Sequence, residues 1–398
     1  MNIKEWIPGT YPIPFFQTWC CENSATTPPS PSSTESMFDE LKNAGLPPKM
    51  YSCIHNHLVL NRVGEDCIHY LFHDRACREF IAREYPPDVL IAYDRLIPTA
   101  FKADLWRYCV LYKYGGVYLD AKLGWGRFRP STTGHGGGGA VTLRMIVERW
   151  LLSGGGGGGD ALFVLERDGV GLWPTGHFGI HNAFIITKPK NPLLLDCIFN
   201  IVSSSKNGGL GDAGVSHGDV GWMTRPLFVT GPGLLGNVWR KHFRCSSVCD
   251  DCPDSYATMA PYFRLFFEGD GCIGYFLGDG DFHGEEEEYI QLLKVYDGYH
   301  DEYSHKMSHT NCVPHYTVLW SQGVVWGGAS PNDARGSASP NDASFVRYRY
   351  DGGARDYGGP GGDGVVGGGD GASVRAGGED EPAQGNTRQV THRCFIFI

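Results

Sequence analysis

The stretch from 101 to 122, FKADLWRYCVLYKYGGVYLDAK, constrains the fold of this chain more than any other. Apolar residues recur in it at the spacing of a buried helical face, at Leu105, Trp106, Cys109, Val110 and Tyr112. Two glycines then supply a left-handed C-terminal cap, and VYL follows as a strand apolar enough for the middle of a covered sheet. The pattern predicts that Asp120 lies at the carboxyl end of a strand, where ligands of open α/β sheets bind.

The flanking segments continue the alternation of strands and helices. Apolar runs that predict strands lie at 13–19, 66–74 and 161–168. Amphipathic runs that predict helices lie at 36–45, 75–87 and 101–116. Later segments repeat the alternation, with a strand and then a helix in 177–202 and a helix at the end of 224–243. This order favours an α/β fold with a mostly parallel central sheet flanked by helices.

Glycine separates the parts of the chain that can form a core from those that cannot. Many of the 56 glycines fall in runs near 131–160 and in the C-terminal part, and such tracts behave as flexible linkers. The segment AVTLRMIVERWLL between two of these runs is predicted to be an inserted helix, an excursion from the main fold. We predict one domain over 1–326 and a largely disordered tail over 327–398, in which SPNDA occurs twice.

Composition and charge narrow the class of protein. Hydrophobic residues make up 41% of the chain, enough for a sizeable core. A net charge of −10 without a long basic stripe argues against a nucleic-acid partner. The N-terminal segment has no apolar run long enough for a signal peptide or a membrane anchor, so we expect no transmembrane segment, and a cytoplasmic location if the chain is complete. The odd number of cysteines, 13, leaves a reducing compartment and partial pairing both open.

The predicted helix before Asp120 also carries polar residues. Asp104 and Arg107 are three positions apart and share a helical face with Tyr108. An acid and a planar cation on one face can hydrogen-bond sugar hydroxyls in opposite senses. They can equally form a mutual salt bridge that only fixes the helix, and the spacing leaves both alternatives open.

Several motifs, in order along the chain, resemble glycosyltransferase family 32, the sugar transferases with a DXD motif that include fungal Golgi mannosyltransferases. They are IPFFQTW, LPPKMYSCI, AYDRLIPTAFKADLWRYCVLYKYGGVYLDAK, FGIHNAFIITKPKNP, TGPGLLG and HYTVLW, which together span about residues 13 to 326. The resemblance implies a GT-A fold and a retaining transfer of a sugar, with mannose as one possible sugar. The donor would be a nucleotide-sugar and the acceptor a glycan, lipid or protein hydroxyl. It also implies the Golgi or another compartment of the secretory pathway.

The resemblance further implies roles for individual residues. Asp104 and Arg107 match the pair that grips the donor sugar, and Asp120 matches the first aspartate of the DXD motif. The implied donor-binding residues are Gln17, Thr18, Trp19, Asp104, Arg107, Tyr108, Asn182 and Trp320. Asp120, together with His315 from the HYTVLW segment, is the implied ligand set for Mn²⁺ or Mg²⁺.

The chain departs from this family where the second aspartate of the motif is expected, because Lys122 stands there. A lysine cannot ligate a hard cation, but its ammonium can approach phosphates as a fixed positive charge. Three alternatives follow. Lys122 replaces the metal; or Asp120 still holds a metal with water and another residue; or the protein is a degenerate, poorly active homologue. In the second alternative Lys122 points elsewhere. A separate alternative is a non-catalytic protein that keeps the fold and binds a sugar or nucleotide. The predicted catalytic residues are Asp104, Arg107, Asp120 and Lys122.

A rival motif lies later in the chain. Cys245, Cys249 and Cys252 have the C-x3-C-x2-C spacing that resembles the iron–sulfur motif of radical SAM enzymes. Its position after the α/β segments and the aspartate at 251 argue against a cluster, so loop cysteines, a zinc site or a disulfide remain as alternatives. His69 and His73 are predicted to be strand and loop residues, because HYLFH looks extended and a ligand pair at this spacing needs a helix.

Overall fold

The structure is a computed structural model that describes residues 3–19, 34–125, 142–152, 160–166, 179–207, 225–242, 263–269, 272–277, 288–299, 301–303, 319 and 325–327. These residues all belong to one compact unit. Several predictions fall outside the described residues: the glycine runs, the cysteine motif and the tail beyond Gly327.

The described strands form one mixed sheet in the order β2-β1-β3-β6-β5-β7-β8-β9-β4. Their bounds are β1 Ile13–Thr18, β2 Cys67–Phe72, β3 Gly116–Leu119, β4 Leu123–Trp125, β5 Ala161–Glu166, β6 Ile180–Thr187, β7 Phe263–Gly269, β8 Cys272–Leu277 and β9 Glu288–Val295. The pairings make β2, β1, β3, β5, β7 and β9 run in one direction and β6, β8 and β4 in the other. Most of the described strands therefore run in one direction, as predicted for this sheet, while three of the eight neighbouring pairs are parallel and five are antiparallel.

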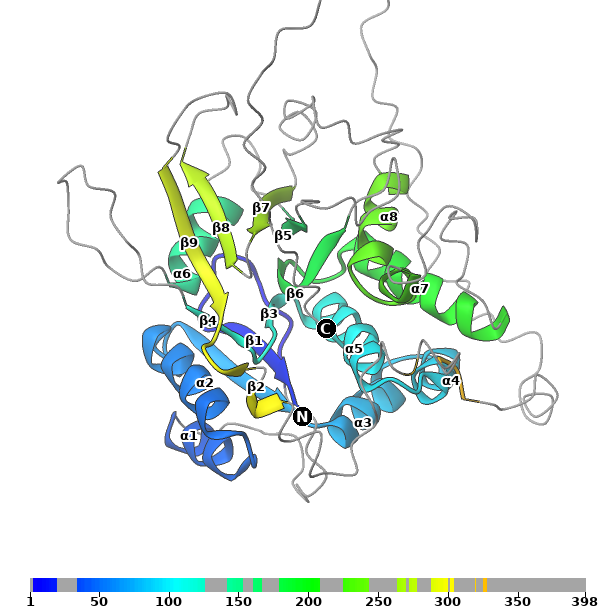
Figure 1. Cartoon of the computed structure of the whole chain (residues 1–398), viewed down its shortest axis with the longest axis horizontal. Coiled ribbons are helices and arrows are strands. Elements are labelled where there is room, and N and C mark those ends of the chain that lie inside the picture. The colour runs from blue at the N-terminus through cyan, green and yellow to red at the C-terminus, as the bar shows by residue number, and fades with distance from the viewer. Residues whose placement is uncertain are drawn as a thin grey trace, which may run out of the picture. The chain divides into compact units, whose positions relative to one another are not determined.

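Helices cover both faces of this sheet (Figure 1). Their bounds are α1 Thr34–Asn43, α2 Pro48–Leu60, α3 Asp74–Glu84, α4 Pro87–Arg95, α5 Thr99–Tyr114, α6 Leu143–Ile146, α7 Pro192–Asn207 and α8 Pro232–His242, with a π-helical turn, η1, at Val147–Leu152 and a 3₁₀ turn, η2, at Arg225–Phe228. In Figure 1, α1 and α2 lie on one side of β1 and β2, and α3, α4, α5 and α7 lie on the other. The prediction of an α/β fold with flanking helices is confirmed.

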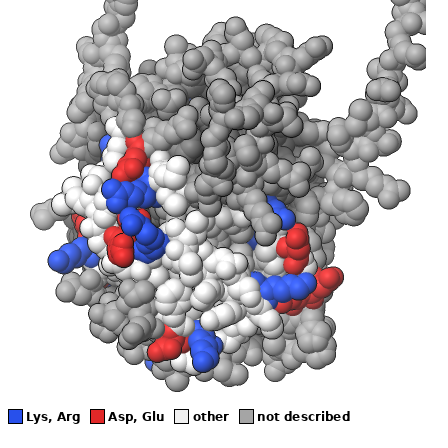
Figure 2. Space-filling model, turned by 90° about the vertical axis from the view of Figure 1, so that its left-hand side faces the viewer, with Lys and Arg blue, Asp and Glu red and all other residues white. Residues whose placement is uncertain are grey.

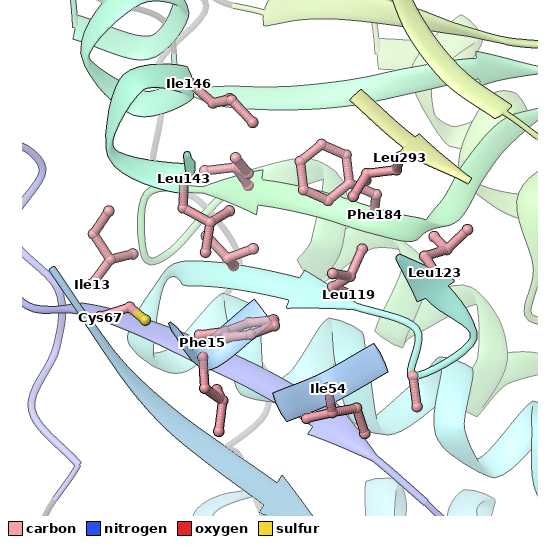
Figure 3. Packing of buried hydrophobic residues seen from close by; sticks show 14 of the residues in the cluster. Ile13, Phe15, Ile54, Cys67, Leu119, Leu123, Leu143, Ile146, Phe184 and Leu293 are labelled. Atoms are coloured by element: carbon pink, nitrogen blue, oxygen red, sulfur yellow. The ribbon is translucent and has the colours of Figure 1, made fainter. Parts of the chain in front are cut away.

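Successive side chains of a strand point to opposite faces, and β1 shows how this builds two cores. Phe15 belongs to a buried cluster with residues of α1, α2, α6 and η1 (Figure 3). Phe16, the next residue, stacks instead on Tyr114 of α5, with 6.5 Å between the ring centroids. Trp106 of the same helix packs on Phe72 of β2, at 4.7 Å between centroids. Helix α5 is thus held against β1, β2 and β3, and the strand that follows it is fully buried.

The segment 140–152 was predicted to be an insertion or an excursion from the main fold, and its described part, 142–152, packs in the core instead of leaving it. Leu143, Ile146, Val147 and Leu151 are at most 1% exposed and belong to the same cluster as Phe15 (Figure 3). Flanking glycine runs made the segment look peripheral, yet its apolar residues are spaced to place one face on the sheet.

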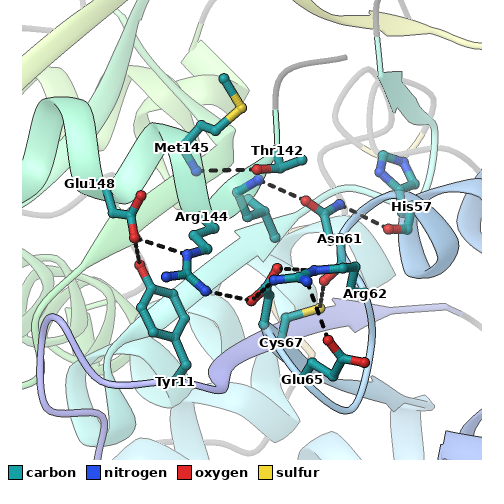
Figure 4. A network of polar contacts seen from close by, with 12 residues as sticks. Tyr11, His57, Asn61, Arg62, Glu65, Cys67, Thr142, Arg144, Met145 and Glu148 are labelled. Atoms are coloured by element: carbon teal, nitrogen blue, oxygen red, sulfur yellow. Dashed lines mark hydrogen bonds and ion pairs between the residues drawn. The ribbon is translucent and has the colours of Figure 1, made fainter. Parts of the chain in front are cut away.

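A network of charged side chains fixes this segment from outside (Figure 4). Arg144 donates hydrogen bonds to Glu148 at 2.9 Å and to Asp66 at 3.1 Å. Tyr11 donates to the same Glu148 at 2.9 Å, and Arg62 makes a two-pronged contact with Asp66 at 2.7 and 2.8 Å. These bonds join the segment to the residues just before β1 and β2.

Some helix ends are determined by neighbouring residues in the sequence, and others by contacts with residues that are distant in the chain. Helix α5 ends at Tyr114, and the cap residue Gly115 has a φ of +66°, a positive value that favours glycine, although its ψ of −164° differs from that of the predicted left-handed cap. Helix α2 was not predicted. It begins at Pro48, and its backbone N–H groups at Lys49 and Met50 donate to the carboxylate of Glu302, at 2.8 and 3.3 Å. The partner that satisfies this helix start comes from the other end of the domain.

The surface of the described residues carries charges of both signs. On the face in Figure 2, basic and acidic side chains lie next to one another, with uncharged residues between these groups. Among the described residues, Arg78 of α3 and Asp94 of α4 form one ion pair, with hydrogen bonds of 2.8 and 2.7 Å. Within the ranges that the structure describes, no helix has both the length and the apolar character to cross a bilayer.

Candidate active site

Asp120 lies directly after the last residue of β3, as the sequence predicted. Its backbone N–H donates to the carbonyl of Ala183 on β6 at 2.8 Å, which extends the sheet by one bond. A tight turn, Asp120–Lys122, then leads into β4, and Leu123 N–H donates back to the Asp120 carbonyl at 3.0 Å. The side chain of Asp120 is 22% exposed, so it lies at the rim of the buried sheet.

Arg107 is the centre of the polar cluster beside this turn. Its Nη1 donates to the carbonyl of Asn182 at 2.7 Å. Its Nη2 lies 3.0 Å from Asp104 Oδ1 and 3.4 Å from Asp120 Oδ1. The guanidinium also lies over the ring of Tyr118, 4.3 Å from the ring centroid. One buried cation therefore contacts two carboxylates, and a cation in this position orients both of them.

Asp104 is almost fully enclosed by hydrogen-bond donors. Thr230 donates to its Oδ2 at 2.7 Å, and the Asn182 side chain donates to its Oδ1 at 2.9 Å. Asn182 also donates to the hydroxyl of Tyr108 at 3.2 Å, and Tyr108 donates to the Thr230 carbonyl at 2.8 Å. The salt bridge between Asp104 and Arg107 is present, but it is one part of a wider network that joins α5, β6 and the start of α8.

The two carboxylates have different electrostatic surroundings. Burial raises the pKa of Asp104, and Arg107, Thr230 and Asn182 only partly oppose it. At Asp120 burial acts in the same direction, but Arg107, Lys122 and the hydroxyl of Tyr118 outweigh it, so the pKa is lowered. Tyr118 donates to Asp120 Oδ1 at 2.7 Å. Asp120 is therefore the more firmly ionised group at neutral pH.

The ammonium of Lys122 lies beside Asp120 Oδ2, whereas Arg107 and Tyr118 contact the other carboxylate oxygen, Oδ1. Its Nζ lies 3.7 Å from Asp120 Oδ2, and its side chain is 32% exposed. The Lys122 carbonyl accepts a hydrogen bond from Tyr296 N–H at 3.0 Å, which ties the turn to the segment after β9. The ammonium thus reaches solvent while its backbone is held.

The donor atoms around Asp120 are a poor match for Mn²⁺ or Mg²⁺. Both cations require several oxygen ligands. Asp120 Oδ1 instead faces a phenol and a guanidinium, and Oδ2 faces the ammonium of Lys122. Among the described residues, no group of three or more His, Cys, Asp or Glu side chains could hold a metal ion. The residues that the structure describes here therefore do not fit a divalent cation, and the second implied ligand, His315, lies outside them.

Other residues expected to bind a donor have varied positions. Gln17 and Tyr108 are fully buried and bonded to protein groups, so they lie beneath the site rather than on its surface. Thr18 is partly exposed and donates to the Phe72 carbonyl at 3.0 Å. Trp19, the next residue, packs at the edge of the main cluster and is also partly exposed. Trp320 lies outside the described residues.

Three participants in this network were missed in the sequence. Thr230 belongs to the TGPGLLG motif but was given no role of its own, and its hydroxyl donates a hydrogen bond to Asp104. Gly231, the next residue, also lies beside Asp104: an added Cβ would be 3.6 Å from Asp104 Oδ2, an ordinary contact, and 3.3 Å from the Leu227 carbonyl oxygen, a tighter one. Tyr118 was counted only as a strand residue, although its alternation in VYL places it on the α5 side, toward Arg107.

The comparisons with known proteins concern this same segment. Residues 49–124 match a family described as "Glycosyltransferase sugar-binding region containing DXD motif". A stretch of 62 residues is 45% identical to inositol phosphoceramide mannosyltransferase 3 of Schizosaccharomyces pombe (strain 972 / ATCC 24843). It covers 16% of this chain and 17% of that protein, so the match spans only about a sixth of the relative.

Among solved structures, the PaToxG glycosyltransferase is 14% identical, with 63% of this chain and 73% of that chain covered and a TM-score of 0.33. A likeness of this extent carries no argument of its own. The family match is more informative, because it contains the helix, strand and turn that build the polar cluster. Asp104, Arg107, Asp120 and Lys122 all lie within a region of the chain that is similar to the sugar-binding region of DXD-containing glycosyltransferases.

Proposed function

We propose that this protein is a glycosyltransferase that uses a nucleotide-sugar donor, and that Lys122 supplies the positive charge which a divalent metal supplies in DXD enzymes. The observation that carries the proposal is the contact between Lys122 Nζ and Asp120 Oδ2, 3.7 Å apart, within the segment that matches the sugar-binding region. The resemblance to family 32 adds a GT-A fold and retention of anomeric configuration to the proposal.

A comparison of charges supports this role for Lys122. Ionised Asp104 and Asp120 together carry two negative charges, which Arg107 and Lys122 balance. With an aspartate at position 122 the net charge of the same cluster would be lower by two units, and a divalent cation would restore it. The lysine therefore brings the same net charge to the site as an aspartate together with its metal.

The reaction needs a positive charge beside the leaving nucleoside diphosphate and hydrogen bonds that orient the donor sugar. When the sugar leaves, negative charge develops on the nucleoside diphosphate, and a fixed cation stabilises it. We assign this task to the exposed ammonium of Lys122, held by Asp120. Asp104 and Arg107 are proposed to hydrogen-bond the hydroxyls of the donor sugar, because the Asp104 side chain remains 12% exposed. Trp19 and Thr18 are proposed to face the nucleotide, and Asn182 to orient Asp104.

The test is a screen of nucleotide-sugars, with GDP-mannose among them, for hydrolysis and transfer in EDTA and in Mn²⁺. Wild type is expected to keep its turnover in EDTA. Lys122→Met should reduce kcat by about 100-fold or more, since the loss of one group that stabilises the transition state has this order of effect. Lys122→Asp should be active in Mn²⁺ and inactive in EDTA. The anomeric configuration of the product, followed by NMR, tests retention.

Lys294→Met is the matched control. Lys294 lies on β9, the strand paired with β4, and is 43% exposed, but it contacts Asp297 rather than the turn. It should leave turnover unchanged. Loss of wild-type turnover in EDTA would show that a metal is still required. Nucleotides that raise the thermal midpoint without any turnover would identify a binding homologue and contradict the proposed enzyme.

A further inference from the structure

Two buried histidines lie beneath the turn that carries Asp120 and Lys122, and the proposed chemistry does not use them. His57 is on α2 and His69 is on β2, and they are 0% and 3% exposed. The ring of Phe15 lies near both, with centroid distances of 6.2 Å to His57 and 5.1 Å to His69. Phe15 is visible in Figure 3 on the same side of the sheet as Leu119 and Leu123, the two residues that flank the turn.

His57 reaches the carbonyl on the far side of the turn. Its Nε2 lies 2.5 Å from the oxygen of Leu123, the residue directly after Lys122. A carbonyl oxygen can only accept, so the proton is on Nε2 and the ring is in the corresponding neutral tautomer. Cys53, one helical turn earlier on α2, donates to the same carbonyl at 3.4 Å. One face of α2 is therefore directed at this single backbone oxygen.

His69 acts on the near side of the turn through Gln17. The Gln17 amide nitrogen donates to the carbonyl of Leu119, the residue directly before Asp120, at 3.2 Å. Its oxygen is then left to accept from His69 Nε2, at 3.0 Å. Strands β1 and β3 are paired at Phe15 with Val117 and at Phe16 with Tyr118. Beyond these pairs, the side chain of Gln17 makes the hydrogen bond that joins β1 to the end of β3.

Backbone hydrogen bonds complete the restraint. Asp120 N–H is bound by β6, the Asp120 carbonyl by Leu123 N–H, and the Lys122 carbonyl by Tyr296 N–H. With Leu119 and Leu123 held from below, the turn is fixed at both ends and in its middle. Because the backbone of the turn is fixed, the distance between the side chains of Asp120 and Lys122 can vary only through their own rotamers.

We propose that His57 is a positioning residue for the Asp120–Lys122 pair, and that Gln17 with His69 is its counterpart on the other side of the turn. The inference rests on the proposed function, because it assigns the two histidines to the same pair. Burial supports it by lowering the pKa of His57 to about 4 and that of His69 to about 3, which keeps both rings neutral and the tautomers fixed.

The test separates the hydrogen bond from the packing of the ring. Glutamine can place an amide nitrogen near the position of Nε2, whereas the shorter asparagine cannot reach it and leucine lacks a donor. We therefore compare His57→Gln, His57→Asn and His57→Leu. His55→Asn is the control, because His55 lies on the same helix but packs on Phe38 and Tyr51, at 5.1 and 5.8 Å between centroids.

Two measurements are made on each folded variant of the full chain. Hydrogen exchange of peptides that contain 119–124 reports the restraint of the turn without any substrate, and peptides from α7 serve as the internal reference. Steady-state kinetics with the best donor then separate kcat from KM. His57→Asn and His57→Leu should increase exchange in the turn by about 10-fold or more and lower kcat by roughly 10- to 100-fold, with little change in KM. His57→Gln and His55→Asn should resemble wild type.

The proposal is overturned if His57→Gln is as impaired as His57→Leu, since the ring would then act by packing alone. It is also overturned if exchange in the turn is the same in all variants. A wild-type protein that turns over no nucleotide-sugar would contradict the proposed function instead, and the exchange measurement would still decide whether His57 holds the turn.

Discussion

Asp104 depends on neighbours that come from three separate elements, and each removes part of the cost of burying a charge. Arg107 is on its own helix, Asn182 is on β6, and Thr230 lies just before α8. A buried carboxylate that loses one donor cannot recover it from water. The cluster is therefore sensitive to small changes at positions that carry no charge.

Thr230→Val tests this dependence with nearly the same volume. It removes the hydroxyl that donates to Asp104 Oδ2, and should lower the free energy of unfolding by about 1–3 kcal/mol, because an acceptor is left unsatisfied. Thr230→Ser keeps the hydroxyl and should lose less. Chemical denaturation at pH 7 measures both, and equal losses would show that the methyl group, rather than the hydrogen bond, matters at this position.

At the scale of elements, the glycine pair between α5 and β3 sets where the strand and the site begin. Gly116 has a φ of +98°, and a Cβ there would overlap the carbonyl oxygen of Pro14. Any larger residue would displace β3 from β1, and with it the turn that carries Asp120.

Gly116→Ala should therefore lower the free energy of unfolding by roughly 3 kcal/mol or more, the sum of a left-handed backbone and a steric overlap. Gly45→Ala is the matched control, because Gly45 has a φ of +63° and nothing within 4 Å of the added Cβ. It should lose only the backbone contribution, about 1–2 kcal/mol. Similar losses for the two variants, measured by denaturation, would mean that β3 shifts to accommodate the methyl group.

Leu143 and Met145 offer a similar contrast on the short helix α6. Leu143 is 1% exposed and Met145 is 51% exposed. Leu143→Ala should cost about 2–5 kcal/mol through lost burial and the cavity that remains, and Met145→Ala should stay within about 0.5 kcal/mol. Thermal or chemical unfolding of both variants measures this. If neither change affects stability, the segment contributes nothing to the core.

The elements that could be predicted are those whose signals are local. The apolar spacing of 101–112, the glycines at 115 and 116 and the position of Asp120 all follow from neighbouring residues, and the structure agrees with them. Helix α2 was missed because the group that caps it, Glu302, is 253 positions away. The packing of 142–152 was misjudged because its flanks are glycine-rich, although its own pattern was helical.

The site shows the same division. The pairing of Asp104 with Arg107 could be expected from helical spacing, but the hydroxyl of Thr230 and the imidazole of His57 could not. Each reaches the site from an element that is distant in the chain, and only the fold brings it there. No short-range pattern indicates that a histidine on α2 contacts the carbonyl that follows Lys122.

For the molecule as a whole, buried titratable groups determine how stability changes with pH. His57 and His69 are neutral in the folded protein, with pKa values lowered by burial to about 4 and about 3, whereas an unfolded chain titrates near the ordinary value of about 6.5. Between these values the unfolded state binds more protons, so acid favours unfolding. Asp66 acts in the same direction at lower pH, because hydrogen bonds from Arg62 lower its pKa.

We therefore expect the free energy of unfolding to be highest above about pH 6.5 and to fall by about 2 kcal/mol per pH unit between pH 6 and pH 5, since two groups each contribute up to about 1.4 kcal/mol per unit. Below about pH 4, protonation of Asp66 should add a further loss. The His57→Gln, His69→Gln double variant should have a slope close to zero between pH 6 and pH 5, while His55→Gln should keep the wild-type slope. Chemical denaturation at half-unit steps of pH measures these slopes. An unchanged slope in the double variant would show that other groups cause the acid sensitivity.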